Sequence, residues 1–216
     1  MLQHFEKTLK LRTLSIIARA MSTEPWSIVH EWKELFLPDD VQLKVGRYYG
    51  MIEGLSREKH LLLENEQGRN VFFVDGAFRR HENGRRDSGC AYFCGPNMYD
   101  AWADNADRPT NNTAELGAIL GALKSANGFP IEIRTDSKYA FEALTKHHYK
   151  WRQNGWINCE SKPVANQQLI EKCLRWIEHK DVQLKWIPRN QNTIAHRMAR
   201  RARDGMYETE YYGMEC

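Results

Sequence analysis

The sequence predicts an α/β fold, in which a mixed sheet of five strands is flanked by helices and preceded by a helical N-terminal extension. The first observation is the order of the expected elements: three short strands in succession, then helix, strand, helices, strand and helix. A hairpin meander followed by helix-linked strands forms a mixed sheet with helices on its faces. The second observation is composition, because 42% of the 216 residues are hydrophobic and 11% are aromatic. This is enough apolar material for a folded core.

Each strand has a recognisable pattern. Residues 71–74 (VFFV) form a short apolar run that ends in Asp75 and Gly76, which is typical of a central buried strand. A polar hairpin loop is predicted over residues 79–87. The other strands are predicted near Ser88–Cys94, Met98–Ala103 and Ile131–Thr135, and over the alternating residues Val182, Leu184 and Trp186.

Helical spacing of apolar residues predicts the helices. In a helix over residues 113–125, one face is formed by Leu116, Ile119, Leu120 and Leu123. Two helices between the fourth and fifth strands are predicted at residues 138–146 and 166–179. A final helix is predicted at residues 193–204.

Residues 1–22 differ in composition from the rest of the chain. Four Lys and Arg side chains and several hydroxyls accompany a single acid, Glu6. This composition resembles a mitochondrial transit peptide, and the alternative is an ordinary N-terminal helix. Met21 provides an alternative start near the end of the segment. We therefore expect an intracellular protein, mitochondrial or nuclear according to the start that is used.

Residues 23–70 are predicted to form a helical extension, with one helix at residues 24–36 and another within residues 48–64. The extension could pack on the main domain or dock a protein partner. The polar stretch before Val71 marks the predicted domain boundary. The predicted divisions are a candidate targeting segment at 1–22, the extension at 23–70, the main domain at 71–204 and a C-terminal tail at 205–216.

Composition excludes several classes of protein. No apolar run approaches the roughly 20 residues that span a bilayer, so no membrane partner is expected. The five cysteines are odd in number and irregularly spaced, without a secretory signal pattern, so we expect reduced thiols. The formal net charge of +3 is too small to identify a nucleic-acid partner by itself.

Three carboxylates lie where this topology concentrates function. Asp75 is expected at the end of the first strand and Asp136 at the end of the fourth, and open α/β sheets bind ligands at such ends. Glu115 lies in the first turn of the helix after the third strand. Each alone could be a turn or cap residue. Together they could hold hard divalent cations, because clustered carboxylates otherwise repel one another and favour protonation.

A series of short motifs runs through residues 71–204. They are VDGA at 74–77, TNNTAEL at 110–116, TDSKY at 135–139, WRQNGW at 151–156 and KPVAN at 162–166, followed by Asn192, Ala195 and Ala199. The first three resemble the successive signatures of the type 1 ribonuclease H family, and the next two are similar to substrate-binding helices of its cellular members. The common order and spacing make the set far more specific than any single motif.

The resemblance implies an endonuclease that cuts the RNA strand of an RNA–DNA hybrid with two divalent cations, Mg²⁺ or Mn²⁺. Metal ions about 4 Å apart can activate a water and stabilise the leaving 3′-oxygen. By its matching position, Asp75 would bridge both ions. Glu115 and Asp136 would complete the two coordination shells. The hybrid is therefore the implied binding partner.

The resemblance also implies residues that recognise the hybrid. Asn111 and Asn112 match positions that read the RNA minor groove and its 2′-hydroxyls, although a turn role is the alternative. A phosphate pocket for the DNA strand would be formed by Arg108, Thr110 and Asn166.

Two tryptophans match the element that lines the DNA channel. Trp151 and Trp156 could each pack a flat ring on deoxyribose. For Trp156 the alternative is packing in the core. Several Lys and Arg side chains around these residues suit phosphate contacts, although a solvated face would look similar.

Two departures from the family pattern bear on activity. Where the family has a fourth aspartate ligand, this chain has His196. A neutral imidazole binds Mn²⁺ more readily than hard Mg²⁺, so His196 could be a fourth ligand with catalytic function. The loop before the last helix is short, as in the plant and archaeal branch of the family. The alternative is an inactivated module that binds hybrids or scaffolds a protein partner.

Overall fold

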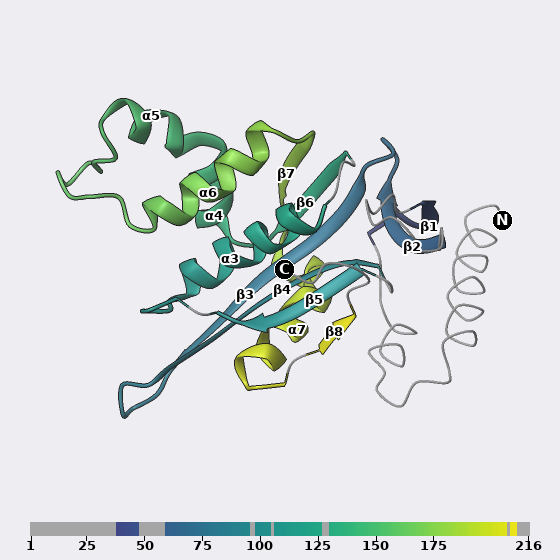
Figure 1. Ribbon diagram of the computed structural model, residues 1–216, viewed down its shortest axis with the longest axis horizontal. Helices are drawn as coiled ribbons and strands as arrows, with labels where there is room; N and C mark the ends of the chain where they lie inside the picture. The colour runs from purple at the N-terminus through teal and green to yellow at the C-terminus, as the bar shows by residue number, and fades with distance from the viewer. Residues whose placement is uncertain are drawn as a thin grey trace, which may run out of the picture. The chain divides into compact units, whose positions relative to one another are not determined.

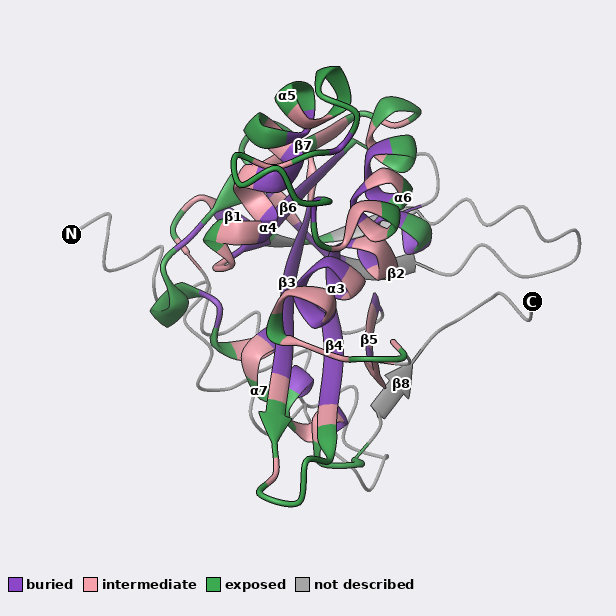
Figure 2. Ribbon diagram, turned by 90° about the vertical axis from the view of Figure 1, so that its left-hand side faces the viewer, coloured by how far each residue is buried: buried purple, intermediate pink, exposed green. Residues whose placement is uncertain are grey.

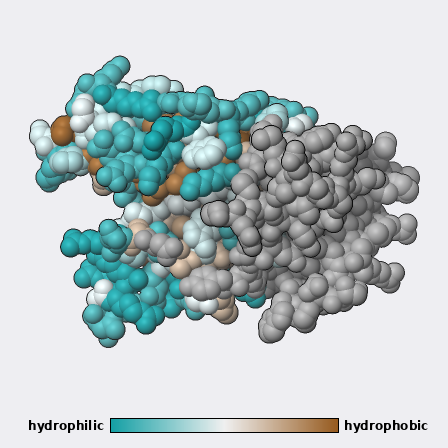
Figure 3. Space-filling view, in the orientation of Figure 1, coloured by the Kyte–Doolittle hydropathy of each residue, from teal (hydrophilic) through white to brown (hydrophobic). Residues whose placement is uncertain are grey.

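The computed structural model describes residues 38–47, 59–95, 98–104, 106–126, 130–206 and 208–210. Residues 39–216 form one compact unit. The targeting segment expected at 1–22 and the helix expected at 24–36 lie outside the described residues. In the part that is described, no helix is long and apolar enough to cross a membrane. Much of the described surface visible in Figure 3 is hydrophilic.

A mixed sheet forms the centre of the compact unit (Figure 1). Its antiparallel part runs in the order β1-β2-β3-β4-β5-β8. On the other side of β3, β6 pairs parallel with β3, and β7 pairs parallel with β6. The strands are β1 (Val41–Arg47), β2 (Lys59–Asn65), β3 (Asn70–Arg80), β4 (Arg86–Gly95), β5 (Met98–Ala103), β6 (Ile131–Thr135), β7 (Val182–Trp186) and β8 (Glu208–Glu210). The predicted α/β class is therefore confirmed, and the five predicted strands correspond to β3–β7.

Helices cover both faces of this sheet (Figure 1). They are α3 (Asn111–Ser125), α4 (Lys138–Glu142), the π-helix η2 (Ala143–His147), α5 (His148–Gln153), α6 (Gln167–Glu178), the 3₁₀ turn η3 (Arg189–Gln191) and α7 (Thr193–Arg203). In β3, a Cβ added to Gly76 would meet the α3 backbone, whereas the next residue toward the N-terminus, Asp75, contacts α7. Because side chains alternate along a strand, α3 and α7 pack on opposite faces of the sheet.

The region before residue 70 differs from the prediction. A helix was expected within residues 48–64, but residues 59–65 form strand β2, which pairs antiparallel with β1 from Val41↔Asn65 to Arg47↔Lys59. Leu62 and Leu63 are both buried, and such a run without alternation does not distinguish a buried strand from a helix. The pair Glu64↔Asn70 then joins β2 to β3, so the sheet continues across the expected boundary at Val71. The predicted C-terminal tail likewise contributes β8, which pairs with β5.

A buried polar network attaches this added region to β6. The Arg134 guanidinium, 1% exposed, donates to the Asp40 carboxylate at 3.0 and 2.6 Å and to Glu132 Oε1 at 2.5 Å. The other oxygen of Glu132 accepts from Asn65 Nδ2 at 3.2 Å. A buried charge is tolerated only when it is paired and hydrogen-bonded, so Arg134 depends on residues from the region before β3.

Candidate active site

Asp75 lies within β3 and not at its end, because the strand continues for five residues to Arg80. Its side chain is almost completely buried, at 3% exposure. The parallel register Val74↔Thr135 brings Asp75 beside Asp136, which directly follows β6. Asp136 therefore has the predicted position, and Asp75 reaches it from the middle of a longer strand.

Glu115 approaches the two aspartates from α3. A Cβ at Gly76 would lie 2.3 Å from Glu115 N, so the helix can come this close only because residue 76 is glycine. Gly76 N then donates to Glu115 Oε2 at 3.2 Å, and Asn111 Nδ2 donates to Glu115 Oε1 at 3.4 Å. One carboxylate oxygen from each of Asp75, Glu115 and Asp136 lies within 4.8 Å of the others. The three predicted acids thus form one cluster.

Burial and crowding favour protons on this cluster. Burial, with the nearby Asp136 charge, raises the pKa of Asp75 to about 6 despite the opposing contact with His196. Burial also raises the pKa of Glu115 well above its usual range, and the charges of Asp75 and Asp136 add to this effect. The anionic cluster therefore needs either protons or a cation.

Asn192 is a member of the site that sequence analysis matched to the family but did not place there. It is fully buried, and its Nδ2 donates to Asp136 Oδ1 at 2.7 Å and to the Val74 carbonyl at 2.8 Å. Its Oδ1 is buried without a hydrogen-bond partner among the described residues. The Asn that opens the last helical motif was the available signal. Its contacts fix Asp136 and leave one oxygen unpaired.

The donor set fits a hard divalent cation. Asp75, Glu115 and Asp136 supply carboxylate oxygens, and the unpaired oxygen of Asn192 lies beside them. Mg²⁺ and Mn²⁺ prefer such oxygen ligands, and a bound cation would relieve the repulsion that raises the carboxyl pKa values. Three of the four predicted ligands, Asp75, Glu115 and Asp136, therefore offer a donor set that fits such a cation.

His196 contacts the cluster through Asp75. On α7, its Nδ1 lies 2.9 Å from Asp75 Oδ2, and Arg189 Nη2 lies 3.0 Å from its Nε2. Arg189 Nη2 also lies 3.1 Å from Nδ1, so the imidazole lies between the Asp75 carboxylate and the Arg189 guanidinium. Among the described residues, the set whose ligand atoms all lie within 4.8 Å contains the three acids without His196. Arg189 is a second neighbour of the site that sequence analysis missed.

The N-terminal end of α3 presents several predicted substrate-binding residues. Thr110 is the N-cap, and its Oγ1 accepts from Thr113 N at 3.1 Å while Thr113 Oγ1 accepts from Thr110 N at 2.8 Å. The capping box therefore occupies the Thr110 hydroxyl. Arg108 and Asn111 are exposed and Asn112 is partly exposed, so these three side chains are accessible beside the acids.

The predicted residues beyond α4 have mixed positions. Trp156 is 8% exposed and belongs to the core, which is the alternative that the sequence left open for it, and its ring centroid lies 6.2 Å from that of Trp151. The positive φ of Trp156, 61°, turns its side chain back into the fold. Trp151 is partly buried. Asn166 has a φ of 62° and donates to the Tyr139 hydroxyl at 3.1 Å, separate from the Thr110 cap.

Comparison with known proteins identifies relatives of this chain. The RNase H family model matches residues 67–204. A ribonuclease H of Tropheryma whipplei (strain Twist) is 33% identical over 123 residues, which are 53% of this chain and 74% of the relative. A ribonuclease H of Schizosaccharomyces pombe is 30% identical over 168 residues, which are 74% of this chain and 62% of the relative.

Solved structures share the fold. LC9-RNase H1, described as a type 1 RNase H with the type 2 active-site motif, has a TM-score of 0.52 at 20% identity, covering 63% of this chain and 72% of its own. A foamy viral protease-reverse transcriptase in complex with an RNA/DNA hybrid has a TM-score of 0.52 at 23% identity, covering 61% of this chain and 19% of its own. At these identities the likeness concerns the fold alone. Since the family model covers well over half of the sequence, the chain belongs to the ribonuclease H family.

Proposed function

We propose that the protein is an endonuclease that hydrolyses the RNA strand of RNA–DNA hybrids at the cluster of Asp75, Glu115 and Asp136, with two divalent cations, Mg²⁺ or Mn²⁺. The observation that carries this proposal is the gathering of three carboxylates, two buried and one partly exposed, within 4.8 Å, with exposed Asn111 one helical turn from Glu115. The relatives named ribonuclease H and the viral neighbour in complex with a hybrid support it.

The acids and Asn192 have separable roles in this proposal. Asp75 lies between Glu115 and Asp136 and is the residue suited to bridging two cations. Gly76 N–H and Asn111 hold the Glu115 carboxylate, and Asn192 holds Asp136. When bound, the cations would supply an activated water and stabilise the leaving 3′-oxygen. Fixed ligands matter because small displacements of reacting groups are costly.

Recognition of the RNA strand belongs to the start of α3. The amide groups of Asn111 and Asn112 can donate to and accept from 2′-hydroxyls, the groups that distinguish RNA from DNA. The exposed guanidinium of Arg108 is proposed to contact a phosphate of the DNA strand. Trp151 and Asn166 are proposed to contact the DNA strand. The Thr110 hydroxyl caps α3, so Thr110 is proposed to act chiefly by positioning the helix.

A second candidate function is a hybrid-binding module or protein scaffold without cleavage. The observation in its favour is His196, which stands where the family has a carboxylate and pairs with Asp75 Oδ2. One oxygen of the proposed bridging ligand is therefore already engaged. The recognition residues at α3 would still bind a hybrid in this case.

Hybrid cleavage in the presence and absence of metal distinguishes these functions. We expect the protein to cut RNA paired with DNA when Mg²⁺ or Mn²⁺ is present and to stop when EDTA is added. Asp75→Asn should abolish cutting and retain hybrid binding, because the amide removes a metal ligand with little change in shape. Asp181→Asn, at the other end of β7, is the matched control and should remain active. Equal cutting of single-stranded RNA would contradict the specificity.

Substitution of His196 tests its role as a ligand. Activity is expected to favour Mn²⁺ over Mg²⁺ in the wild type, and His196→Asp should raise Mg²⁺-supported cleavage, because an anionic oxygen suits a hard ion better than nitrogen. His196→Ala should lose more activity than His196→Asp. The measurement is the initial cleavage rate in each metal. Identical Mg²⁺ rates for the three proteins would show that His196 has no such role.

The acid cluster should reduce the stability of the metal-free protein. The folded-state pKa of Asp75, about 6, exceeds the ordinary value of 3.8, so the free energy of unfolding falls as pH rises between these values. At pH 7 without metal, Asp75→Asn should therefore be more stable than the wild type by roughly 2 kcal/mol, and the difference should vanish below about pH 4.

Urea unfolding in EDTA at several pH values measures this difference. Asp181→Asn should unfold like the wild type, within about 0.5 kcal/mol. Added Mg²⁺ should narrow the gap, because it binds the folded wild type. A metal-free Asp75→Asn protein that is less stable than the wild type at pH 7 would show that Asp75 is not destabilising.

A further inference from the structure

The hairpin that joins β3 and β4 extends beyond the helices and ends in exposed residues (Figure 2). Four of its residues are arginines: Arg79, Arg80, Arg85 and Arg86. These arginines fall into two pairs with different surroundings. The difference indicates what the hairpin binds.

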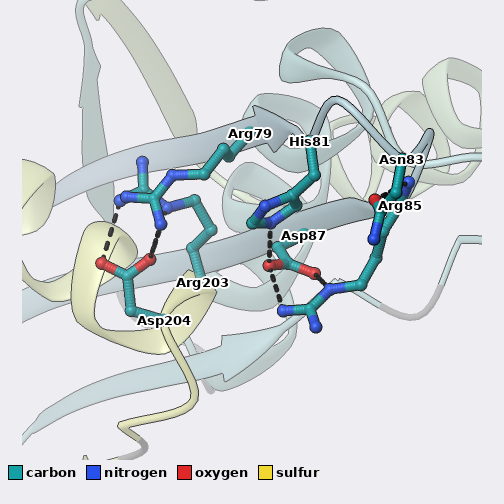
Figure 4. A network of polar contacts seen from close by, with 7 residues as sticks. All are labelled: Arg79, His81, Asn83, Arg85, Asp87, Arg203 and Asp204. Atoms are coloured by element: carbon teal, nitrogen blue, oxygen red, sulfur yellow. Dashed lines mark hydrogen bonds and ion pairs between the residues drawn. The ribbon is translucent and has the colours of Figure 1, made fainter.

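Arg79 and Arg85 have carboxylate partners, as Figure 4 shows. Arg79 lies 3.2 Å from Asp204, the residue that follows α7. Arg85 donates to Asp87 at 2.8 and 2.9 Å, and His81 Nε2 lies 2.6 Å from Oδ2 of the same carboxylate. Both arginines of this pair therefore have a carboxylate partner within the fold, although Asp204 is shared with Arg203.

Arg80 and Arg86 lie on the other face of the hairpin and directly oppose each other in the β3–β4 register. Arg80 and Gly76 are four residues apart in β3, so their side chains are on the same face of the sheet, the face on which Gly76 packs against α3. Arg86, which is directly opposite Arg80, projects from the same face. Arg86 Nη1 donates to the Pro109 carbonyl at 3.2 Å, which places it beside the exposed Arg108.

This second pair has an unbalanced charge. Among the described residues, no ion pair joins Arg80, Arg86 or Arg108 to a carboxylate. Asp87, which directly follows Arg86, pairs instead with Arg85 and His81. Like charges directly opposite each other on a sheet are destabilising. An external anion between them would convert this repulsion into attraction, and phosphate accepts arginine hydrogen bonds well.

We propose that Arg80 and Arg86, together with Arg108, form a phosphate-binding arm that holds the hybrid backbone away from the cleaved bond; the inference rests on the proposed function. Arg80 is five residues beyond Asp75 in the same strand, a span of about 17 Å at about 3.4 Å per residue. Along one nucleic-acid strand this equals about five nucleotides, or about half a helical turn. The arm therefore extends the contact surface that begins at Asn111.

The salt dependence of hybrid binding tests the arm. In the non-cleaving Asp75→Asn background, Arg80→Gln/Arg86→Gln is compared with the control Arg79→Gln/Arg85→Gln, which removes the same charge from the same hairpin. Fluorescence anisotropy with a labelled 20-base-pair hybrid is measured over a range of KCl concentrations. The first double variant should lower the slope of log Kd against log salt by roughly 1.5 and weaken binding about tenfold. The control should change the slope by less than half as much.

A second measurement localises the contact. Shortening the hybrid from one of its two ends should make the Asp75→Asn protein and the Arg80→Gln/Arg86→Gln variant bind alike, whereas shortening from the other end should preserve their difference. Circular dichroism and thermal unfolding confirm that each variant is folded. Equal slopes for the two double variants, or convergence on shortening from either end, would overturn the arm.

The outcomes separate this inference from the proposed function. If the wild type cuts hybrids but both double variants bind them alike, the phosphate-binding role of Arg80 and Arg86 is refuted and the proposed nuclease activity is retained. A wild type that never cuts, with Asp75→Asn binding hybrid no better than double-stranded DNA, would overturn both.

Discussion

Three carboxylates held close together, two of them buried, are the constraint on which the rest of this structure depends. Burial and mutual repulsion raise the carboxyl pKa values of Asp75 and Glu115, which means that the anionic cluster is unfavourable in the fold alone. A protein can maintain such a cluster only if its scaffold is rigid enough to prevent the acids from moving apart. The same arrangement that lowers the stability of the metal-free fold favours the binding of a divalent cation.

The scaffold is supplied by the central strands and the helices packed on them. Parallel pairing of β3 with β6 sets the distance between Asp75 and Asp136, and Gly76 allows α3 to bring Glu115 against them. Asn192 links Asp136 to the β3 backbone. On the far side of β6, the paired Arg134 ties the region before β3 to the same strand. The catalytic fold therefore uses residues that precede the region matched by the family model.

Much of the sheet could be predicted because its strands have strong local patterns. Met98–Ala103 and Ile131–Thr135 have the predicted limits, since turns and polar residues bound each apolar stretch. Strand β2 was mistaken for helix because its run of leucines has no alternation. The pairing of β8 involves only three residues, too few for a periodic signal.

The acids could be predicted more readily than their surroundings. Asp75, Glu115 and Asp136 come together as expected, because strand order and motif spacing determine their positions. The Asn192 contacts with Val74 and Asp136 join distant parts of the chain, so no local pattern reveals them. For Trp156 the motif left both substrate contact and core packing open, and the structure places it in the core with a positive φ. The pairing of His196 with both Asp75 and Arg189 is likewise a tertiary contact.

The proposed function requires Asp75, Glu115 and Asp136 to form a metal centre. The most direct measurement is anomalous diffraction from crystals grown with Mn²⁺ and a hybrid bound to the His196→Ala protein and to the wild type. The account predicts a Mn²⁺ peak bonded to oxygens of Asp75, Glu115 and Asp136 in both, and a second peak whose occupancy falls in His196→Ala. Absence of any peak at the three carboxylates, with Mn²⁺ bound elsewhere or not at all, would contradict it.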